Sequence, residues 1–257
     1  MLASAVILAA GASRRMGKPK ALVRWEGRTL LEWAVHNAAV HCSECVVVAG
    51  HAGIEVCDAV SQLAARGYPV QAVKNPVPTR GMLSSILVGA EAVGTDWFFV
   101  SPVDMPCLDP AVYLALLQEA EWSYGVGGET YPRSCCETTA ETRQQRDLAG
   151  EGPVTPGKSP PYKGLDGFLQ HDSRYTPTYS FYPLWQDHRG HPVLVARQAL
   201  EGVAFPSEQA PREGGAMRRL LEQYPARGVA VNHRGILLDL DTPEDLNRAD
   251  CSDRGEL

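Results

Sequence analysis

A short stretch near the start of the chain combines glycine with basic side chains in a way that suits a polyphosphate. It runs from Leu8 to Lys20, LAAGASRRMGKPK, and directly follows a short apolar run. Glycines in such a turn leave backbone N–H groups open to phosphate oxygens. Arg15 and Lys20 can neutralise the charge of the same ligand. The stretch therefore predicts a phosphate-binding loop, and a basic surface turn without a ligand is the alternative.

Two common phosphate-binding patterns do not match this stretch. In the Walker A pattern the second glycine lies five positions after the first and is followed by Lys and a hydroxyl residue. Here Gly11 and Gly17 are six positions apart, and Lys18 is followed by proline. The dinucleotide pattern G-x-G-x-x-G also fails, because Ser13 stands where its second glycine would be.

Strand-like and helix-like segments alternate over about the first hundred residues. The strand-like segments are short, β-branched or aromatic and bounded by Gly, Pro or Asp, and they cover residues 5–9, 45–50, 69–75 and 96–104. Three segments between them have helical spacing of apolar residues, and they cover residues 29–41, 55–67 and 82–94. This alternation predicts buried parallel strands in a doubly wound, mostly parallel α/β sheet.

In sheets of this kind, ligands bind beyond the carboxyl ends of the strands. We therefore expect three segments that are distant in sequence to share one rim of the sheet: the Leu8–Lys20 stretch, the turn NPVPTRGM at 75–82 and PVDMP at 102–106.

The middle of the chain interrupts the alternation. Residues 125–173 are rich in Gly, Pro, Thr and charge and poor in Ile, Leu and Val, so we interpret them as a long flexible insertion, or alternatively as a lid. Beyond it we expect ordered segments at 177–185 and 190–202, a helix near 214–224 and paired strands at 228–232 and 235–241. A last helix is expected to be capped by Thr242, with Pro243 at its first position. The chain is interpreted as one domain over 1–250 with a tail at 251–257.

Length and composition narrow the class of protein. The chain has 257 residues, 44% of them hydrophobic, and a formal net charge of -6, which argues against a general nucleic-acid binder. No apolar run approaches the roughly 20 residues of a membrane span, and the basic residues follow the first apolar run, the reverse of a secretory signal. We expect a cytoplasmic protein with neither nucleic acid nor membrane as a partner. An odd number of cysteines, seven, favours reduced thiols.

Five motifs in register give the chain a family resemblance. They are L-A-A-G-x-S-x-R-M-G-x-x-K from Leu8, N-P followed by G-M-x-x-S from Asn75, P-x-D-x-P from Pro102, G-H-P from Gly190 and D-x-D-T-P-E-D-L from Asp239. Together they resemble the MobA-like nucleotidyltransferases and, within them, the molybdenum cofactor cytidylyltransferases. The resemblance covers the chain apart from the insertion, which departs from the shorter link of relatives and bears on the shape of the acceptor side. It implies a Rossmann-like nucleotidyltransferase fold.

The resemblance also implies a reaction. A nucleoside triphosphate lies over the first loop, the terminal phosphate of an acceptor attacks its α-phosphorus, and pyrophosphate leaves with the help of Mg²⁺. Arg15, Lys20 and Asp104 are the implied catalytic residues. The implied metal ligands are Asp104 and Asp241, with Asp239 beside them. A cap or turn role for Asp104 and solvated charge for Asp239 or Asp241 are the structural alternatives.

The same resemblance assigns binding residues. The nucleotide set consists of Leu8, Ala9, Ala10, Gly11, Ser13, Arg15, Lys20, Asn75, Gly81, Met82, Ser84, Ser85, Pro102 and Asp104, and the acceptor set of Gly190 and His191. CTP is the expected nucleotide, because GTP-using relatives resemble L-A-G-G where this chain has Ala10, and a methyl group near the base favours the smaller pyrimidine. A molybdopterin-type cofactor is the expected acceptor, and the apo-enzyme that receives the cofactor is a further expected partner.

Other functions remain open at this point. A related transferase acting on a phosphosugar or phosphoalcohol would have similar loops. A non-catalytic nucleotide-binding protein that delivers a cofactor would keep the first loop but could lose Asp104 and Asp241, and both are present. A dinucleotide-binding oxidoreductase fits poorly, since Gly50 and His51 stand where an acidic residue should close the second strand.

Overall fold

The structure, a computed structural model, describes residues 1–11, 16–124, 179–203 and 224–249. The insertion predicted at 125–173, most of the helix expected near 214–224, the tail at 251–257, and the candidate residues Ser13 and Arg15 lie outside these ranges.

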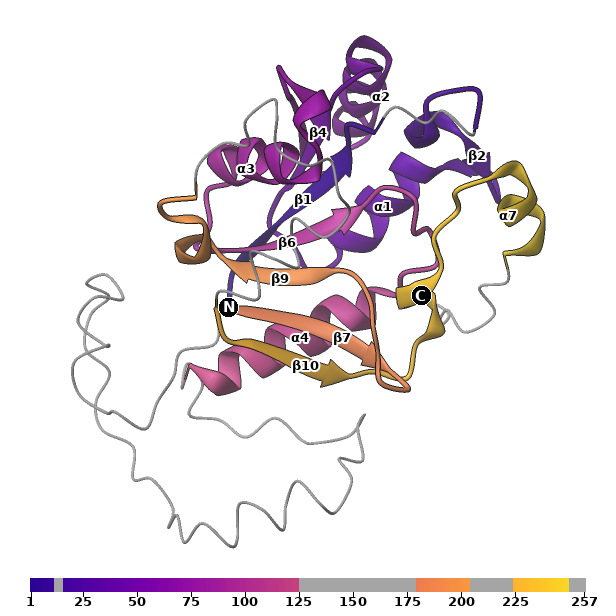
Figure 1. Cartoon of the computed structure of the whole chain (residues 1–257). Helices are drawn as coiled ribbons and strands as arrows, with labels where there is room; N and C mark the ends of the chain where they lie inside the picture. Colours follow the sequence, from indigo (N-terminus) through magenta and orange to yellow (C-terminus); the bar gives the residue numbers. More distant parts are fainter. Residues whose placement is uncertain (12–15, 125–178, 204–223, 250–257) are drawn as a thin grey trace, which may run out of the picture.

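An eight-stranded sheet forms the centre of the protein (Figure 1). Its path runs β10-β7-β9-β6-β1-β4-β5, with β8 paired to β7. The predicted strands are confirmed as β1 (Ala3–Ala9), β4 (Cys45–Ala49), β5 (Val70–Lys74) and β6 (Trp97–Pro102), and all pairings among them are parallel. The expectation that all four are buried is wrong for β5, which lies at the edge of the sheet and has no buried residue.

The other half of the sheet is mixed. Strand β9 (Val193–Ala196) runs antiparallel between β6 and β7 (Ser180–Trp185), and β10 (Ala226–Ala230) runs parallel to β7 at the second edge. A two-residue strand, β8 (His188–Arg189), folds back on β7.

The prediction of paired strands at 228–232 and 235–241 is wrong. Strand β10 pairs with β7 instead, and Arg234–Leu237 forms a 3-10 helix. Gly235 packs so closely on the backbone carbonyl of Cys107 that a Cβ there would lie 2.1 Å from its oxygen. The carbonyl of Ile236 accepts the N–H of His191 at 3.1 Å. These contacts turn the segment across the strand ends, so it does not extend the sheet.

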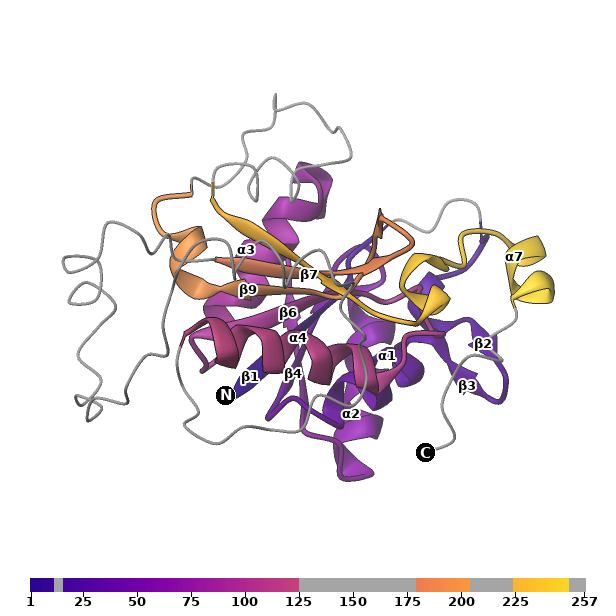
Figure 2. The same ribbon diagram turned by 90° about the horizontal axis from the view of Figure 1, so that it is seen from below.

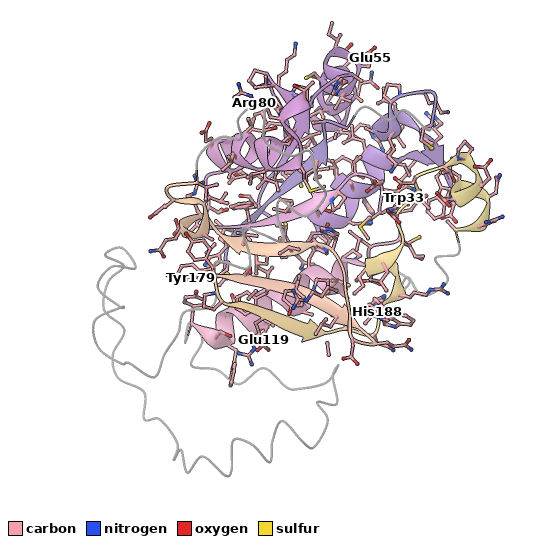
Figure 3. All side chains as sticks on the ribbon, viewed as in Figure 1. Trp33, Glu55, Arg80, Glu119, Tyr179 and His188 are labelled. Carbon is pink, nitrogen blue, oxygen red and sulfur yellow. The ribbon has the colours of Figure 1, made fainter. Side chains whose placement is uncertain are left out.

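Helices cover both faces of the sheet. Helices α1 (Leu30–Ala39), α2 (Gly53–Ala65) and α4 (Pro110–Ser123) lie on one face and α3 (Met82–Ala92) on the other, as Figure 2 shows. Side chains fill the space between these layers (Figure 3). The N-terminus of α1 is capped by Thr29, whose side chain accepts the N–H of Glu32.

One helix packs unusually close to the sheet. A Cβ on Gly89 of α3 would lie 2.3 Å from Cγ1 of Val6 in β1, so only glycine fits at this point without movement. The core on this side includes Val46, Val48 and Ile86, all fully buried. Burial of such side chains stabilises the helix on the sheet by about 1.5–3 kcal/mol for each residue.

A third cluster joins the two ends of the chain. The hairpin of β2 (Arg24–Trp25) and β3 (Arg28–Thr29) packs beside the last helix, α7 (Pro243–Arg248) (Figure 1). The indole N–H of Trp25 donates to the carbonyl of Leu246 at 3.1 Å. The cap predicted for α7 is confirmed, with Thr242 as N-cap and Pro243 in the first turn. The C-terminal segment is thereby fixed next to the first loop.

Two further predictions from the sequence concern membrane spans and the state of the cysteines. Within the described ranges, no helix is both long and apolar enough to cross a membrane. Cys42, Cys45 and Cys57 are free, but Cys107 is disulfide-bonded, so the expectation of reduced thiols is wrong for that residue.

Candidate active site

A cavity of about 520 Å³ opens at the carboxyl ends of β1 and β6. The first loop, the turn before α3, the end of β6 and the segment before α7 all contribute to it, as expected from the rim of a doubly wound sheet. Its lining consists of Leu8, Ala9, Ala10, Gly11, Met16, Lys20, Ala21, Pro78, Gly81, Met82, Ser85, Pro102, Val103, Asp104 and Asp241.

The backbone of the first loop is fixed by the strand next to it. Gly50, which follows β4, approaches Ala10 so closely that a Cβ at Gly50 would lie 2.5 Å from the Ala10 carbonyl oxygen. The imidazole Nδ1 of His51 lies 3.2 Å from the same oxygen. These contacts hold the end of β1 in one position beside the cavity.

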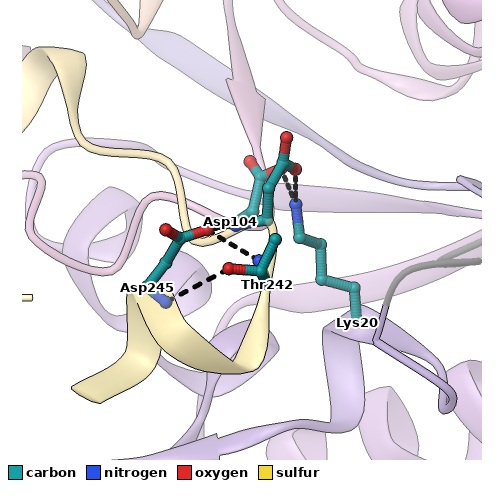
Figure 4. A network of polar contacts seen from close by, with 5 residues as sticks. Lys20, Asp104, Thr242 and Asp245 are labelled. Atoms are coloured by element: carbon teal, nitrogen blue, oxygen red, sulfur yellow. Dashed lines mark hydrogen bonds and ion pairs between the residues drawn. The ribbon is translucent and has the colours of Figure 1, made fainter. Parts of the chain in front are cut away.

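A lysine and two carboxylates meet at the cavity wall (Figure 4). The ammonium of Lys20 donates to Oδ2 of Asp104 at 2.6 Å and forms a second ion pair with Asp241. Lys20 is the most enclosed of the three, with 13% of its side chain exposed, against 21% for Asp104 and 45% for Asp241. Burial alone would lower the pKa of Lys20, but the hydrogen bonds and charges of Asp104 and Asp241 raise it.

The two carboxylates come from segments that bind each other directly. Asp104 follows β6, and its backbone carbonyl accepts the N–H of Leu240 at 2.9 Å. The side chain of Leu240 is 2% exposed in the cluster that also contains Met16 and Trp25. Asp241 is therefore brought to the cavity by a buried neighbour, although it lies far from Asp104 in sequence.

The turn before α3 is braced by a buried amide. Nδ2 of Asn75 donates to the hydroxyl oxygens of Ser84 and Ser85 at 2.9 and 3.0 Å, and its Oδ1 accepts the N–H of Val77. The hydroxyl of Ser84 donates in turn to the carbonyl of Gly81 at 2.7 Å. Asn75 and Ser84 are buried behind the cavity, whereas Gly81, Met82 and Ser85 from the same predicted set line it.

The predicted acceptor residues lie outside the lining. Gly190 packs on Ile236, where a Cβ would meet the carbonyl oxygen at 2.4 Å. Nδ1 of His191 is buried and has no hydrogen-bond partner among the described residues. Burial lowers the pKa of His191, whereas the charge of Asp104, a hydrogen bond with the backbone of Val100 and the charge of Asp239 act in the opposite direction. Asp239 itself is exposed and does not line the cavity, so the DLD segment contributes Asp241 alone.

Sequence reasoning missed part of the lining. Met16, Ala21, Pro78 and Val103 were not among the candidates, although each lies inside or next to a predicted motif. Nothing in the sequence distinguishes these four residues from neighbours that do not line the cavity. In the described ranges, no group of three or more His, Cys, Asp or Glu side chains could hold a metal ion, so a cation here would have two protein carboxylates and would need oxygens from a ligand.

Comparison with known sequences gives a family match and named relatives. Residues 5–149 match the MobA-like NTP transferase domain. The chain is 25% identical over 240 residues to the molybdenum cofactor cytidylyltransferase of Escherichia coli K12, covering 93% of this chain and 91% of that protein. It is 36% identical over 101 residues to a probable molybdenum cofactor guanylyltransferase of Bacillus cytotoxicus, covering 39% of this chain and 48%, about half, of that relative.

Solved structures share the fold. A nucleotidyl transferase from Methanothermobacter superposes with a TM-score of 0.57 at 20% identity, covering 96% of this chain and 95% of that one. The inositol-1-phosphate CTP transferase from T. maritima superposes with a TM-score of 0.54 at 11% identity, covering 95% and 91%. The likeness confirms the α/β fold predicted from the alternation of strands and helices.

Proposed function

The chain belongs to the MobA-like NTP transferase family and is a nucleotidyltransferase, and from this premise we propose that it transfers CMP from CTP to the terminal phosphate of a molybdopterin-type cofactor. In this reaction an oxygen of the acceptor phosphate forms a new bond to the α-phosphorus of CTP. The bond from the α-phosphorus to the bridging oxygen breaks, and pyrophosphate leaves. A phosphate monoester is already ionised near neutral pH, so the reaction needs no general base.

The observation that carries the proposal is the convergence of a phosphate loop, a lysine and two carboxylates on one cavity. The end of β1 and Lys20 suit the triphosphate, because backbone N–H groups and a partly buried ammonium stabilise negative charge. Arg15, from the same loop, is proposed to bind the triphosphate beside Lys20. Catalysis then consists of positioning and charge neutralisation.

Asp104 and Asp241 are the residues we propose to hold Mg²⁺. Both form ion pairs with the ammonium of Lys20, and this shared positively charged partner supports the proposal. Carboxylates are hard oxygen ligands, and Mg²⁺ accepts one or two of them together with phosphate oxygens. When bound, Mg²⁺ would supply stabilisation of the charge that develops on the phosphates. Asp239 is not included, because it is exposed and lies outside the cavity lining.

The choice of CTP rests on Ala10. This residue lines the cavity, and its backbone cannot withdraw because Gly50 packs against it. We propose that an alanine at this fixed position leaves less room for a purine than a glycine would. The E. coli relative, which matches this chain over 91% of its own length, is called a cytidylyltransferase, and this name agrees with the proposal.

The acceptor is proposed to approach from the side of Gly190 and His191. A buried imidazole nitrogen without a partner in the described part of the chain suits a polar contact with a ligand. A phosphoalcohol such as an inositol phosphate is the second candidate, favoured by the fold shared with the T. maritima enzyme. We further propose the cytoplasm as the location and the apo-enzyme that receives the finished cofactor as a partner.

Pyrophosphate release tests the proposed function. The protein is incubated with Mg²⁺, each of the four nucleoside triphosphates and either molybdopterin or inositol 1-phosphate. We expect release with CTP and molybdopterin, and little with the other combinations. A preference for GTP would contradict the role assigned to Ala10. Pyrophosphate release only with inositol 1-phosphate would show that the acceptor is a phosphoalcohol and not molybdopterin.

A further inference from the structure

Asp241 lacks the support that regular structure gives to other residues of the cavity. It follows a 3-10 helix, belongs to no strand and leaves 45% of its side chain exposed. Asp104, in contrast, lies in the turn that directly follows a buried central strand. A ligand position in an enzyme must be held to within about half an ångström, so Asp241 requires a support from elsewhere.

The support comes from the first turn of α7. One carboxylate oxygen of Asp245, Oδ2, accepts the N–H of Thr242 at 2.7 Å and the N–H of Asp241 at 3.0 Å (Figure 4). The side chain of Thr242 accepts the N–H of Asp245 at 3.2 Å in return. An ordinary capping box satisfies only the N-cap N–H in this way. Here the same oxygen also holds the residue before the N-cap, which is Asp241.

Asp245 meets both N–H groups with one carboxylate oxygen, which suits this role. An ionised carboxylate only accepts hydrogen bonds, and bonds to a charged acceptor are stronger than neutral ones. The backbone of Asp241 is therefore tied to a fixed negative group.

Helix α7 is itself anchored on the opposite side. The indole of Trp25 donates to the carbonyl of Leu246, and Leu246 packs against the cluster of Trp25 and Leu240. The N–H of Leu240 is bonded to the carbonyl of Asp104. A continuous set of contacts thus runs from the β2–β3 hairpin through α7 to Asp241, and Asp245 is the link that contacts Asp241.

We propose that Asp245 is a positioning residue that orients Asp241 as a ligand for the divalent cation of the nucleotide complex. This inference rests on the proposed function. Asp245 does not line the cavity, and it acts through the backbone of Asp241. Loss of such an outer partner of a metal ligand typically weakens metal binding by about 10–100-fold.

The test compares Asp245→Ala and Asp245→Asn with a matched cap variant, Thr29→Ala. Alanine removes the acceptor, whereas asparagine keeps the shape and one oxygen that can accept both N–H groups. Thr29 caps α1 by accepting the N–H of Glu32, and it does not line the cavity. Binding of Mn²⁺ in the presence of the non-hydrolysable α,β-methylene analogue of CTP is measured by electron paramagnetic resonance, and the melting temperature is recorded for each variant.

We expect Mn²⁺ binding to weaken about tenfold or more in Asp245→Ala, to recover to within about threefold of wild type in Asp245→Asn, and to be unchanged in Thr29→Ala even though its melting temperature falls. Equal Mn²⁺ affinity in Asp245→Ala and Thr29→Ala would overturn the inference. Failure of the wild-type protein to bind Mn²⁺ with the analogue would instead overturn the proposed nucleotide site, so the two failures are distinguishable.

Discussion

The first loop and the segment before α7 line the same cavity, but they are held there by different means. The first loop continues β1, and its Ala10 is locked against Gly50 by direct backbone packing. The segment with Asp241 has no regular structure, and it is held by two hydrogen bonds: the N–H of Asp241 donates to the side chain of Asp245, and the N–H of Leu240 donates to the carbonyl of Asp104.

The difference matches the chemistry proposed for each side. Phosphate binding by backbone N–H groups requires a rigid main chain, which close packing of parallel strands provides. A carboxylate that binds a cation needs a fixed orientation. A hydrogen-bonded helix cap can provide this orientation for a residue outside the helices and strands. Variants on the two sides should therefore separate catalysis from nucleotide binding.

The largest effect is expected for Asp104→Asn. The change removes an anionic ligand without altering the shape of the side chain, while Lys20 and the first loop still face the triphosphate. Turnover should fall on the order of a thousandfold, because several kcal/mol of metal stabilisation are lost from the barrier, and nucleotide affinity should change little. Pyrophosphate release and calorimetric nucleotide binding are measured side by side.

An exposed carboxylate on α2 provides the control for that experiment. Asp58→Asn makes the same chemical change away from the cavity and should leave both quantities at the wild-type level. Full activity of Asp104→Asn would show that Asp104 is not a catalytic metal ligand.

Gly50→Ala should reduce nucleotide affinity, the quantity that Asp104→Asn should leave nearly unchanged. Its Cβ would lie 2.5 Å from the carbonyl oxygen of Ala10, so the first loop must shift. Overpacking of this kind costs about 1–3 kcal/mol of stability, and we expect nucleotide affinity to fall by about tenfold. Gly94→Ala is the matched control, because its Cβ would meet only Glu44 at an ordinary 3.6 Å. Unchanged affinity in Gly50→Ala would show that the position of the first loop does not limit binding.

The parallel half of the protein could be predicted from the sequence because local and global signals agree there. Short apolar strands, capped helices and glycine turns identified β1, β4, β5 and β6 in their parallel arrangement. Ligands of such sheets bind beyond the carboxyl ends of the strands, and this principle correctly predicted that the first loop, the turn at Gly81 and Asp104 share one cavity.

The second half was harder to predict for a physical reason. The run GILLDLD has the composition of a strand, but contacts of Gly235 with Cys107 and of Leu240 with Asp104 determine its path. Such long-range contacts have no local pattern, so the path of this segment could not be predicted from its composition, and the preference for Asp241 over Asp239 rested on the family resemblance.

Asn75 illustrates a second limit of sequence reasoning. It was predicted to bind the nucleotide, but its amide is hydrogen-bonded to Val77, Ser84 and Ser85, and it does not line the cavity. A polar side chain that braces a loop and one that contacts a ligand have the same sequence signal.

The smallest effect is expected from shortening the middle of the chain. Replacing Gly127 to Asp172 with a short Gly/Ser linker should leave the melting temperature and nucleotide affinity near the wild-type values, since the composition of this segment contributes little apolar surface and loop closure depends weakly on length. Thermal unfolding and calorimetric nucleotide binding check both expectations. A variant that fails to fold would show that the segment is an integral part of the domain.

The central claim, that Asp241 and not Asp239 joins Asp104 at the cation, is tested most directly by the pair Asp241→Asn and Asp239→Asn. Both changes are chemically identical and lie in the same short segment, but only Asp241 contacts Lys20 at the cavity. Initial rates of CTP-dependent pyrophosphate release are measured for both at saturating Mg²⁺. We predict a loss on the order of a hundredfold or more for Asp241→Asn and a change within about twofold for Asp239→Asn. An inactive Asp239→Asn beside a nearly normal Asp241→Asn would contradict the account.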